Sequence, residues 1–313
     1  MAWRPRNILL SVKTALIVYN PAARNAPDRD RLAAAAAALD DEWLVELVET
    51  AAPGDGVRRA AEASLSGASV VFACGGDGTI NEVVNGLAGG NTALGVIRGG
   101  MGDVFAKEVR IPRDPEAALR LLLDGERRRF DLGRAGERYF LLMCGVGFDA
   151  GIVRRVPNAA KRRLGSASYA LWALRQLLGY RARRTALHVN GEDYERDLFW
   201  LLLGNTRSYG GVLNITSDAK VDDGLLDAYI FAGRGLPWRL LTLLRLALRR
   251  QRGARGVEFR RVNELAIDEE GLPVQADGEY LGETPMRFSV APQALDVLLP
   301  PGAGSRLFSL TRS

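Results

Sequence analysis

The residues best suited to chemistry form a glycine-rich turn, Gly75-Gly76-Asp77-Gly78-Thr79. A β-branched apolar run over residues 69–73 enters it, and the segment that leaves it repeats apolar side chains at helical spacing: Ile80, Val83, Val84 and Leu87. Glycines let a ligand approach the backbone, and a helix N-terminus offers N–H donors with partial positive charge. Thr79 and Glu82 have the spacing of a capping box. The pattern predicts a loop for nucleotide phosphates, with an ordinary tight turn as the alternative.

Acidic residues beside glycines are the other candidates for chemistry. Asp222-Asp223-Gly224 could hold Mg²⁺, which prefers oxygen ligands, or could be a polar hairpin turn. Asp277-Gly278-Glu279 could accept a proton from a substrate hydroxyl, although Asp-Gly is also a common hairpin signal. Asp131-Leu132-Gly133 allows the same two interpretations. His188 is the only histidine, so carboxylates must do the acid–base work if the chain is an enzyme.

The predicted helices and strands that position these residues follow a different order before and after residue 125. Strand and helix patterns alternate up to that point, which predicts a doubly wound, mostly parallel α/β domain over residues 13–125. Strand patterns then follow each other with short turns, which predicts a β-sandwich domain over residues 126–301. We expect single strands there at 139–144, 286–290 and 295–299, among others.

Composition and charge narrow the class of protein. No run approaches the roughly 18 apolar residues of a membrane span, and residues 1–12 read as a frayed leader without a signal-peptide core. Cys74 and Cys144 lie in apolar runs and are expected as core residues of a cytoplasmic protein. Sixteen of the 42 Lys and Arg residues fall in two segments without acids, Arg154–Arg184 and Arg234–Arg255. This predicts a local basic surface.

The order of these motifs resembles the diacylglycerol kinase catalytic domain family, which includes sphingosine, ceramide and bacterial lipid kinases. The resemblance covers roughly residues 13–300. It is carried by Asn20-Pro21, the 75–81 stretch, the 100–106 loop, Asp131-Leu132-Gly133, Asp222-Asp223-Gly224 and Asp277-Gly278-Glu279. The glycine-rich turn alone is shared with NAD kinases, and the later Asp-Gly-Glu separates the lipid kinases from them.

The resemblance implies that Mg²⁺ and ATP act in a cleft between an N-terminal nucleotide domain and a C-terminal β-sandwich. It implies that these residues surround ATP: Asn20, Pro21, Arg24, Thr50, Gly75, Gly76, Asp77, Gly78, Thr79, Asn81, Gly100 and Met101. It further implies an Mg²⁺ site with its acidic network: Lys220, Asp222, Asp223, Leu225 and Asp131. Asp277 and Glu279 match the catalytic pair, either of which could be the base. The tail, 302–313, is expected to return to the first domain.

One loop departs from the family pattern, which usually reads Pro-x-Gly-Thr-x-Asn. This chain has Arg98-Gly99-Gly100-Met101-Gly102-Asp103 instead. Met101 replaces a hydroxyl near the phosphates, a change of about 1 kcal/mol for one neutral hydrogen bond. Asp103 would repel a triphosphate unless it faced a metal or solvent.

The sequence therefore predicts an ATP-dependent kinase for diacylglycerol or a related lipid, bound peripherally to an anionic membrane. Leu236–Arg250 is expected as a basic amphipathic helix that meets the membrane or packs on the sandwich. No aromatic-rich basic platform for nucleic acid is present. The alternatives are a soluble kinase of the NAD kinase type and a weakly active lipid- or nucleotide-binding homologue. The oligomeric state is left open, with a homodimer among the options.

Overall fold

The computed structural model describes residues 13–39, 42–156, 172, 175–211, 214–303 and 306–309. These residues form two compact units, one within Met1–Leu132 and Pro292–Leu310 and the other within Gly133–Ala291. The expected leader, most of the first basic segment between 157 and 174, and residues 304–305 and 310–313 of the tail lie outside the described residues. The expected domain limits stay a prediction.

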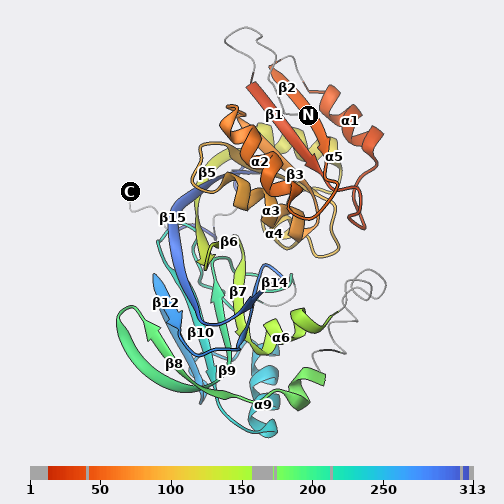
Figure 1. Cartoon of the computed structure of the whole chain (residues 1–313). Coiled ribbons are helices and arrows are strands. Elements are labelled where there is room, and N and C mark those ends of the chain that lie inside the picture. The colour runs from red at the N-terminus through yellow and green to blue at the C-terminus, as the bar shows by residue number, and fades with distance from the viewer. Residues whose placement is uncertain are drawn as a thin grey trace. The chain divides into compact units, whose positions relative to one another are not determined.

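The first unit is built on parallel strands in the order β2-β1-β3-β4 (Figure 1). Their bounds are Lys13–Tyr19 for β1, Trp43–Glu49 for β2, Val70–Gly75 for β3 and Ala93–Arg98 for β4. Two late residues of β15 (Met286–Leu299), Asp296 and Val297, pair in parallel with β4. Buried apolar strands of this kind require helices on both faces.

Five described helices connect and cover these strands. They are α1 (Arg29–Ala37), α2 (Asp55–Leu65), α3 (Asp77–Leu87), α4 (Val104–Glu108) and α5 (Pro115–Leu123). α2 packs with α3, and α1 packs with α5. The start of α5 follows from its sequence, because Asp114 accepts the Ala117 N–H at 2.9 Å and a proline fills the first helical position. The expected α/β architecture is confirmed.

The second unit is an antiparallel sheet with helices α6 and α9 and a further described helical stretch at residues 175–179. Its main strand order is β14-β13-β7-β9-β8-β12-β15, and β10 pairs with β9 and β11. β5 (Glu126–Ala135) begins in the first unit and ends in the second. The other strands of the second unit are β6 (Arg138–Phe140), β7 (Met143–Gly147), β8 (Arg183–Val189), β9 (Glu192–Gly204), β10 (Leu226–Ala232), β11 (Val257–Val262), β12 (Glu264–Ile267), β13 (Pro273–Ala276) and β14 (Glu279–Glu283), and its helices include α6 (Phe148–Arg155) and α9 (Leu236–Ala247). The expected sandwich-like domain is confirmed.

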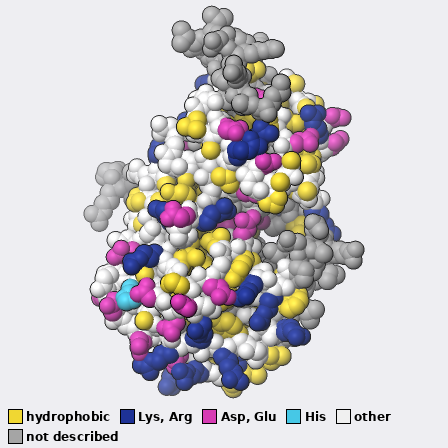
Figure 2. Space-filling model, in the orientation of Figure 1, with side chains coloured by type: hydrophobic (Ala, Val, Ile, Leu, Met, Phe, Trp, Pro, Cys, Tyr) yellow, Lys and Arg dark blue, Asp and Glu magenta, His cyan; other side chains and the backbone are white. Residues whose placement is uncertain are grey.

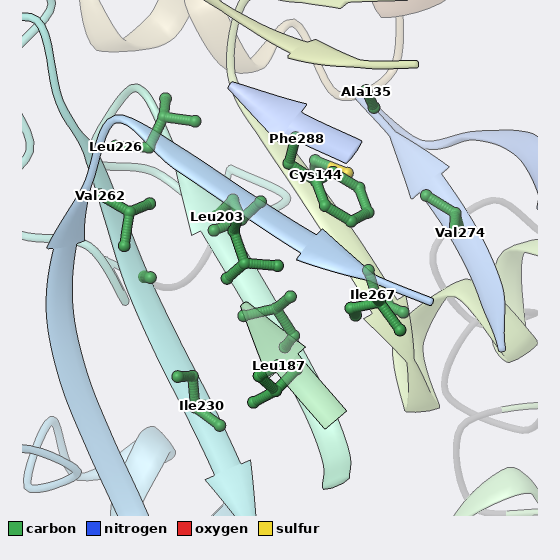
Figure 3. Close-up of a cluster of buried hydrophobic side chains, with 14 of the residues drawn as sticks. Ala135, Cys144, Leu187, Leu203, Leu226, Ile230, Val262, Ile267, Val274 and Phe288 are labelled. Carbon is green, nitrogen blue, oxygen red and sulfur yellow. The ribbon is translucent and has the colours of Figure 1, made fainter. Parts of the chain in front are cut away.

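The core of this unit lies inside the curved sheet (Figure 3). Alternate residues of each strand point into it, as in β10, where Leu226, Ala228 and Ile230 are buried there. On β9 and β10 a separate aromatic cluster forms, in which Trp200 stacks on Phe231 with ring centroids 4.8 Å apart. These strands therefore carry large buried side chains along most of their length.

Two expectations about strands are wrong. The single strand expected at 139–144 is broken into β6 and β7, because the N–H groups of Leu141, Leu142 and Met143 turn to the carboxylate of Asp277. The two strands expected at 286–290 and 295–299 are one continuous strand, β15. α6 and β14 are additional elements that the sequence pattern did not predict.

Candidate active site

The glycine-rich turn lies where β3 ends and α3 begins. Gly76 is the N-cap residue of α3, so the turn presents a helix N-terminus with its backbone donors. At Gly75 and at Gly100 a side chain would not fit without a shift of its neighbours. A Cβ on Gly75 would lie 2.4 Å from the Thr79 hydroxyl, and a Cβ on Gly100 would lie 2.8 Å from the Cα of Gly76. The β4–α4 loop thus packs directly against the β3–α3 turn, backbone to backbone.

The loop after β1 joins the same cluster. Asn20 donates its side-chain amide to the Thr79 hydroxyl at 3.0 Å. Asn25 donates its side-chain amide to the carbonyl of Gly100 at 2.8 Å, and its N–H to the carbonyl of Gly99 at 3.0 Å. The loops that follow β1, β3 and β4 are thereby tied together at the carboxyl ends of neighbouring parallel strands, where α/β sheets bind ligands.

The remaining expected nucleotide residues of this unit lie around the same loops. Pro21 follows Asn20 and is exposed, and Arg24 contacts the sulfur of Met101 at 3.2 Å. Thr50 follows β2, and its N–H donates to the carbonyl of Tyr19. Asn81 points into the packed side of α3 and is 3% exposed.

The expected capping box at the start of α3 is wrong. Thr79 lies within the helix rather than at its N-cap. Glu82 does not reach back to Thr79 but accepts the N–H groups of Gly54 at 2.9 Å and Gly56 at 2.8 Å. Its carboxylate therefore holds the start of α2, which packs against α3. Negative charge is favourable at the N-terminal end of a helix.

Asp77 and Asp103 both have structural partners. Asp77 accepts the Val104 N–H at 2.9 Å and so caps α4. Asp103 is 3% exposed, accepts the Gly100 N–H at 2.8 Å and pairs with Arg98 at 3.1 Å. Arg98 and Asp103, the first and last residues of the departing loop, thus neutralise each other. The repulsion of phosphate that Asp103 alone would cause is therefore reduced.

In the second unit, Asp277-Gly278 forms the tight turn between β13 and β14. Both residues have positive φ, 48° and 83°, as a hairpin turn of this length favours. The Asp277 carboxylate accepts three backbone N–H groups, at 2.8 Å from Leu141 and 2.9 Å from Leu142 and Met143. Its oxygens are therefore engaged in holding the turn.

Glu279 begins β14 and differs from Asp277 in its surroundings. Its side chain is 40% exposed, and one oxygen lies 3.5 Å from the guanidinium of Arg138. A carboxylate that is partly open to solvent can reach a substrate hydroxyl. The two members of the expected pair thus differ in their contacts: Asp277 accepts three backbone N–H groups, whereas Glu279 faces a guanidinium and solvent.

Sequence reasoning missed a relay of side chains behind this turn. Gln275 accepts the Gly278 N–H at 2.9 Å and donates its amide to Asp149 at 2.9 Å. Asp149 is 2% exposed, and burial raises its pKa to about 6. Gly145 leaves room for this carboxylate, since a Cβ there would lie 2.0 Å from it, but the sequence alone gives no signal of the contact. Asp149 and Gln275 thus position the turn that carries Glu279.

The expected metal ligands are partly engaged with the backbone. Asp223 accepts the Leu225 N–H at 3.1 Å across the turn at Gly224. Asp131, in the first unit, is 1% exposed and accepts the Gln293 N–H at 2.7 Å. Within the described ranges, no three Asp, Glu, His or Cys side chains are grouped as metal ligands.

A hard cation nevertheless fits the chemistry of the 222–227 turn. Mg²⁺ usually takes one or two carboxylates, together with carbonyl oxygens and water, and Asp222 and Asp223 supply carboxylates. One buried oxygen of Asp227 has no hydrogen-bond partner. Burial raises the pKa of Asp227 to about 7, and the nearby charge of Asp223 adds to the shift. A cation here would relieve that concentration of acidic groups.

An α/β unit with a glycine-rich turn at a helix N-terminus, joined to an antiparallel unit that presents an acidic turn, is the organisation of a two-domain kinase. The comparisons with known proteins identify the family. Residues 14–135 match the model of the diacylglycerol kinase catalytic domain, and residues 143–299 match the YegS C-terminal NAD kinase beta sandwich-like domain.

Known relatives agree over nearly the whole chain. A probable lipid kinase YegS-like protein of Pseudomonas putida is 34% identical over 301 residues, which cover 95% of this chain and 98% of the relative. A diacylglycerol kinase of Bacillus subtilis is 29% identical over 295 residues, 92% of this chain and 97% of the relative. A crystal structure of a diacylglycerol kinase from Bacillus anthracis shares the fold, with a TM-score of 0.67, 20% identity and coverage of 93% and 98%.

The chain belongs to the diacylglycerol kinase catalytic domain family. It is a kinase, and the expected family resemblance is confirmed. None of the helices in the described part of the chain has the length and hydrophobicity of a membrane-spanning segment.

Proposed function

We propose that this chain transfers the γ-phosphate of ATP to a hydroxyl of diacylglycerol or a related lipid. The observation that carries the proposal is the packing of Gly100 against Gly76 at the N-terminus of α3. A backbone surface without side chains at a helix N-terminus suits phosphate oxygens. The names of the relatives, a probable lipid kinase and a diacylglycerol kinase, support a lipid as the acceptor.

The first unit would bind the nucleotide. Backbone N–H groups around Gly76 and Gly78 would bind phosphate oxygens, and the exposed Arg24 would add a positive charge beside the β4–α4 loop. The Asn20–Thr79 hydrogen bond keeps the loops together. The paired Asp103 adds little net negative charge. The weakly active homologue is therefore the less favoured alternative.

The second unit would supply the base. We assign this role to Glu279, whose carboxylate accepts the proton of the lipid hydroxyl as the oxygen attacks the γ-phosphorus and ADP leaves. Asp277 is assigned a positioning role, since its oxygens accept three backbone N–H groups. Arg138 keeps a positive charge near Glu279. Positioning and charge neutralisation would provide most of the rate enhancement.

Asp222 and Asp223, with the backbone carbonyls of Lys220 and Leu225, would hold Mg²⁺. A magnesium ion at a kinase site neutralises charge on phosphate groups or orders the acidic residues around it. Asp131 would act in the first unit by holding Gln293 in place.

A lipid substrate places the reaction at a membrane surface. We propose peripheral association with an anionic membrane from the cytoplasmic side, where ATP is available. The acid-free segment Arg234–Arg255 supports an anionic surface as partner.

A lipid-panel assay tests the proposed activity. Purified chain is incubated with labelled ATP, Mg²⁺ and detergent micelles that contain diacylglycerol, ceramide or a sphingoid base. NAD serves as the soluble acceptor. We expect label in one lipid class and none in NAD. Label in NAD alone would favour the soluble kinase, and binding of ATP without any transfer would favour the inactive homologue.

A further inference from the structure

Helix α9 leaves a row of leucines open to solvent, although it also buries Leu246. Its exposed side carries leucines: Leu240 is 50% exposed, Leu241 43%, Leu244 55% and Leu248, just after the helix, 57%. Its buried side includes Thr242, which is 1% exposed. The spacing of the leucines makes a continuous stripe along the helix. Large contiguous apolar patches on a protein surface mark interaction sites.

The inward side of α9 is firmly held, so the orientation follows from specific contacts. Trp238 packs edge-on against Phe199, with ring centroids 5.8 Å apart, and donates its indole N–H to the carbonyl of Arg255 at 3.2 Å. Arg239 donates its guanidinium to the carbonyls of Leu177 and Tyr180. Rotating the leucines inward would break these contacts.

Arginines border the leucine stripe at the end of the helix. Arg249 and Arg250 are exposed and Arg245 is half-buried, and none of them forms an ion pair with the part of the chain that is described. Arg249 has a φ of 55° in the position after the helix where glycine is preferred. An arginine thus occupies a position whose backbone conformation favours glycine. Figure 2 shows blue basic and yellow apolar side chains gathered at the lower end of the view, where Figure 1 places α9.

We propose that the leucine stripe of α9 inserts into the interface of an anionic bilayer, with Arg245, Arg249 and Arg250 on lipid phosphates. Charge complementarity favours this partner, because a second copy of the chain would bring the same unpaired arginines together. An interfacial helix combines an apolar face with basic flanks in this way. Leu178 is a further exposed leucine, 59% exposed, in the segment whose carbonyls accept from Arg239. The role of this membrane binding in catalysis rests on the proposed lipid kinase function. The binding of α9 to an anionic bilayer does not depend on that function.

An environment-sensitive label on α9 tests the insertion. Cys74 and Cys144 are both buried, and burial raises the pKa of Cys74 to about 12, so a thiol reagent will label a new surface cysteine selectively. Leu244→Cys carries a nitrobenzoxadiazole label, and Leu65→Cys, at a leucine that is 90% exposed in α2, is the matched control. The vesicles are phosphatidylcholine with or without phosphatidylglycerol.

We expect a blue-shifted, brighter emission from the label at 244 on vesicles with phosphatidylglycerol, and no change at 65. No shift at 244, or equal shifts at both sites, would overturn the proposal. A shift at 244 that grows with protein concentration in the absence of lipid would also overturn it and would assign the stripe to a second copy.

A binding series gives the size of the effect. Leu240→Gln with Leu244→Gln should weaken vesicle co-sedimentation by about tenfold to a hundredfold, because each leucine loses apolar insertion. Arg249→Gln with Arg250→Gln should weaken it about fivefold per charge, on anionic vesicles only. Unchanged binding of the leucine variant would contradict insertion.

Activity in detergent micelles separates this inference from the proposed function. If lipid is phosphorylated in micelles but α9 does not insert into vesicles, the inference fails and the kinase assignment stands. If α9 inserts but no lipid is phosphorylated, the lipid kinase assignment fails and the membrane surface stands.

Discussion

Replacing Asp277 with asparagine should destabilise the second unit, although it changes only one side-chain atom. In the native turn the carboxylate accepts the N–H groups of Leu141, Leu142 and Met143 at 2.8–2.9 Å. Asparagine has one acceptor oxygen, and its NH₂ group would face at least one of these N–H donors. A hydrogen bond to a charged group contributes about 1.5–3 kcal/mol, and an unsatisfied buried donor costs a similar amount. We therefore expect a loss of about 2–4 kcal/mol in the free energy of unfolding.

The backbone does not complicate this substitution. Asp277 has a φ of 48°, and asparagine tolerates this left-handed region as well as aspartate does. Denaturant unfolding followed by circular dichroism measures the change, and an activity assay on the same preparation measures the effect on turnover. The free energy of unfolding and the turnover should both fall for Asp277→Asn, because the displaced turn carries Glu279.

Glu279→Gln is the matched control. Its side chain is 40% exposed, so its free energy of unfolding should stay within about 0.5 kcal/mol of the original while its activity is lost. The reasoning would be refuted if Asp277→Asn unfolded at the same denaturant concentration as the original chain. It would also be refuted if both variants lost stability equally.

Three further predictions concern other contacts. Glu82→Gln should lower the free energy of unfolding by about 1–2 kcal/mol, because the N–H of either Gly54 or Gly56 would lose its acceptor. Urea denaturation measures this change. Gly100→Ala should weaken ATP binding in calorimetry, because its Cβ would collide with the β3–α3 turn, whereas Gly179→Ala has open space and should bind normally. The hydrogen bond with Asp193 raises the pKa of His188 above 6.5, so this pair stabilises the fold fully below pH 6.5 and less as the pH rises through the higher folded pKa. His188→Gln should therefore lower the melting temperature more at pH 5.5 than at pH 9. An equal decrease at both pH values would contradict the pairing.

The alternation of elements in the first unit could be predicted because local patterns decide it. Pro115–Leu123 has a proline at its start, an Asp before it and apolar residues at helical spacing, and α5 has those bounds. The break between β6 and β7 could not be predicted. Its cause is the carboxylate of Asp277, more than 130 residues away in sequence, which takes backbone donors that a strand would otherwise use.

The candidate site was predictable in its glycines and less so in its acids. A glycine's role follows from the backbone of the turn it occupies, as for Gly75 and Gly76. The role of an acid depends on which donors the fold brings to it. Glu82 had the spacing of a local cap but binds the start of α2, and Asp103 is neutralised by Arg98. A partner more than 20 residues away decides the role of Glu82. Asp103 is paired within its own loop, five residues from Arg98, but the spacing alone does not show that the loop brings the two side chains together.

The outward orientation of the α9 leucines shows the same limit. The sequence predicts an amphipathic helix but does not say which side faces the protein. That choice depends on Trp238 and Arg239, which find partners in β9 and in residues 177–180.

The most direct test of the central claim is the rate of phosphate transfer to lipid in detergent micelles by the original chain and by Glu279→Gln. Calorimetry on both measures their affinity for Mg²⁺ and ATP. If Glu279 accepts the hydroxyl proton, the variant should bind the nucleotide normally and transfer phosphate about 10²- to 10⁴-fold more slowly. Equal rates for the two proteins, or no labelled lipid from the original chain, would contradict the account.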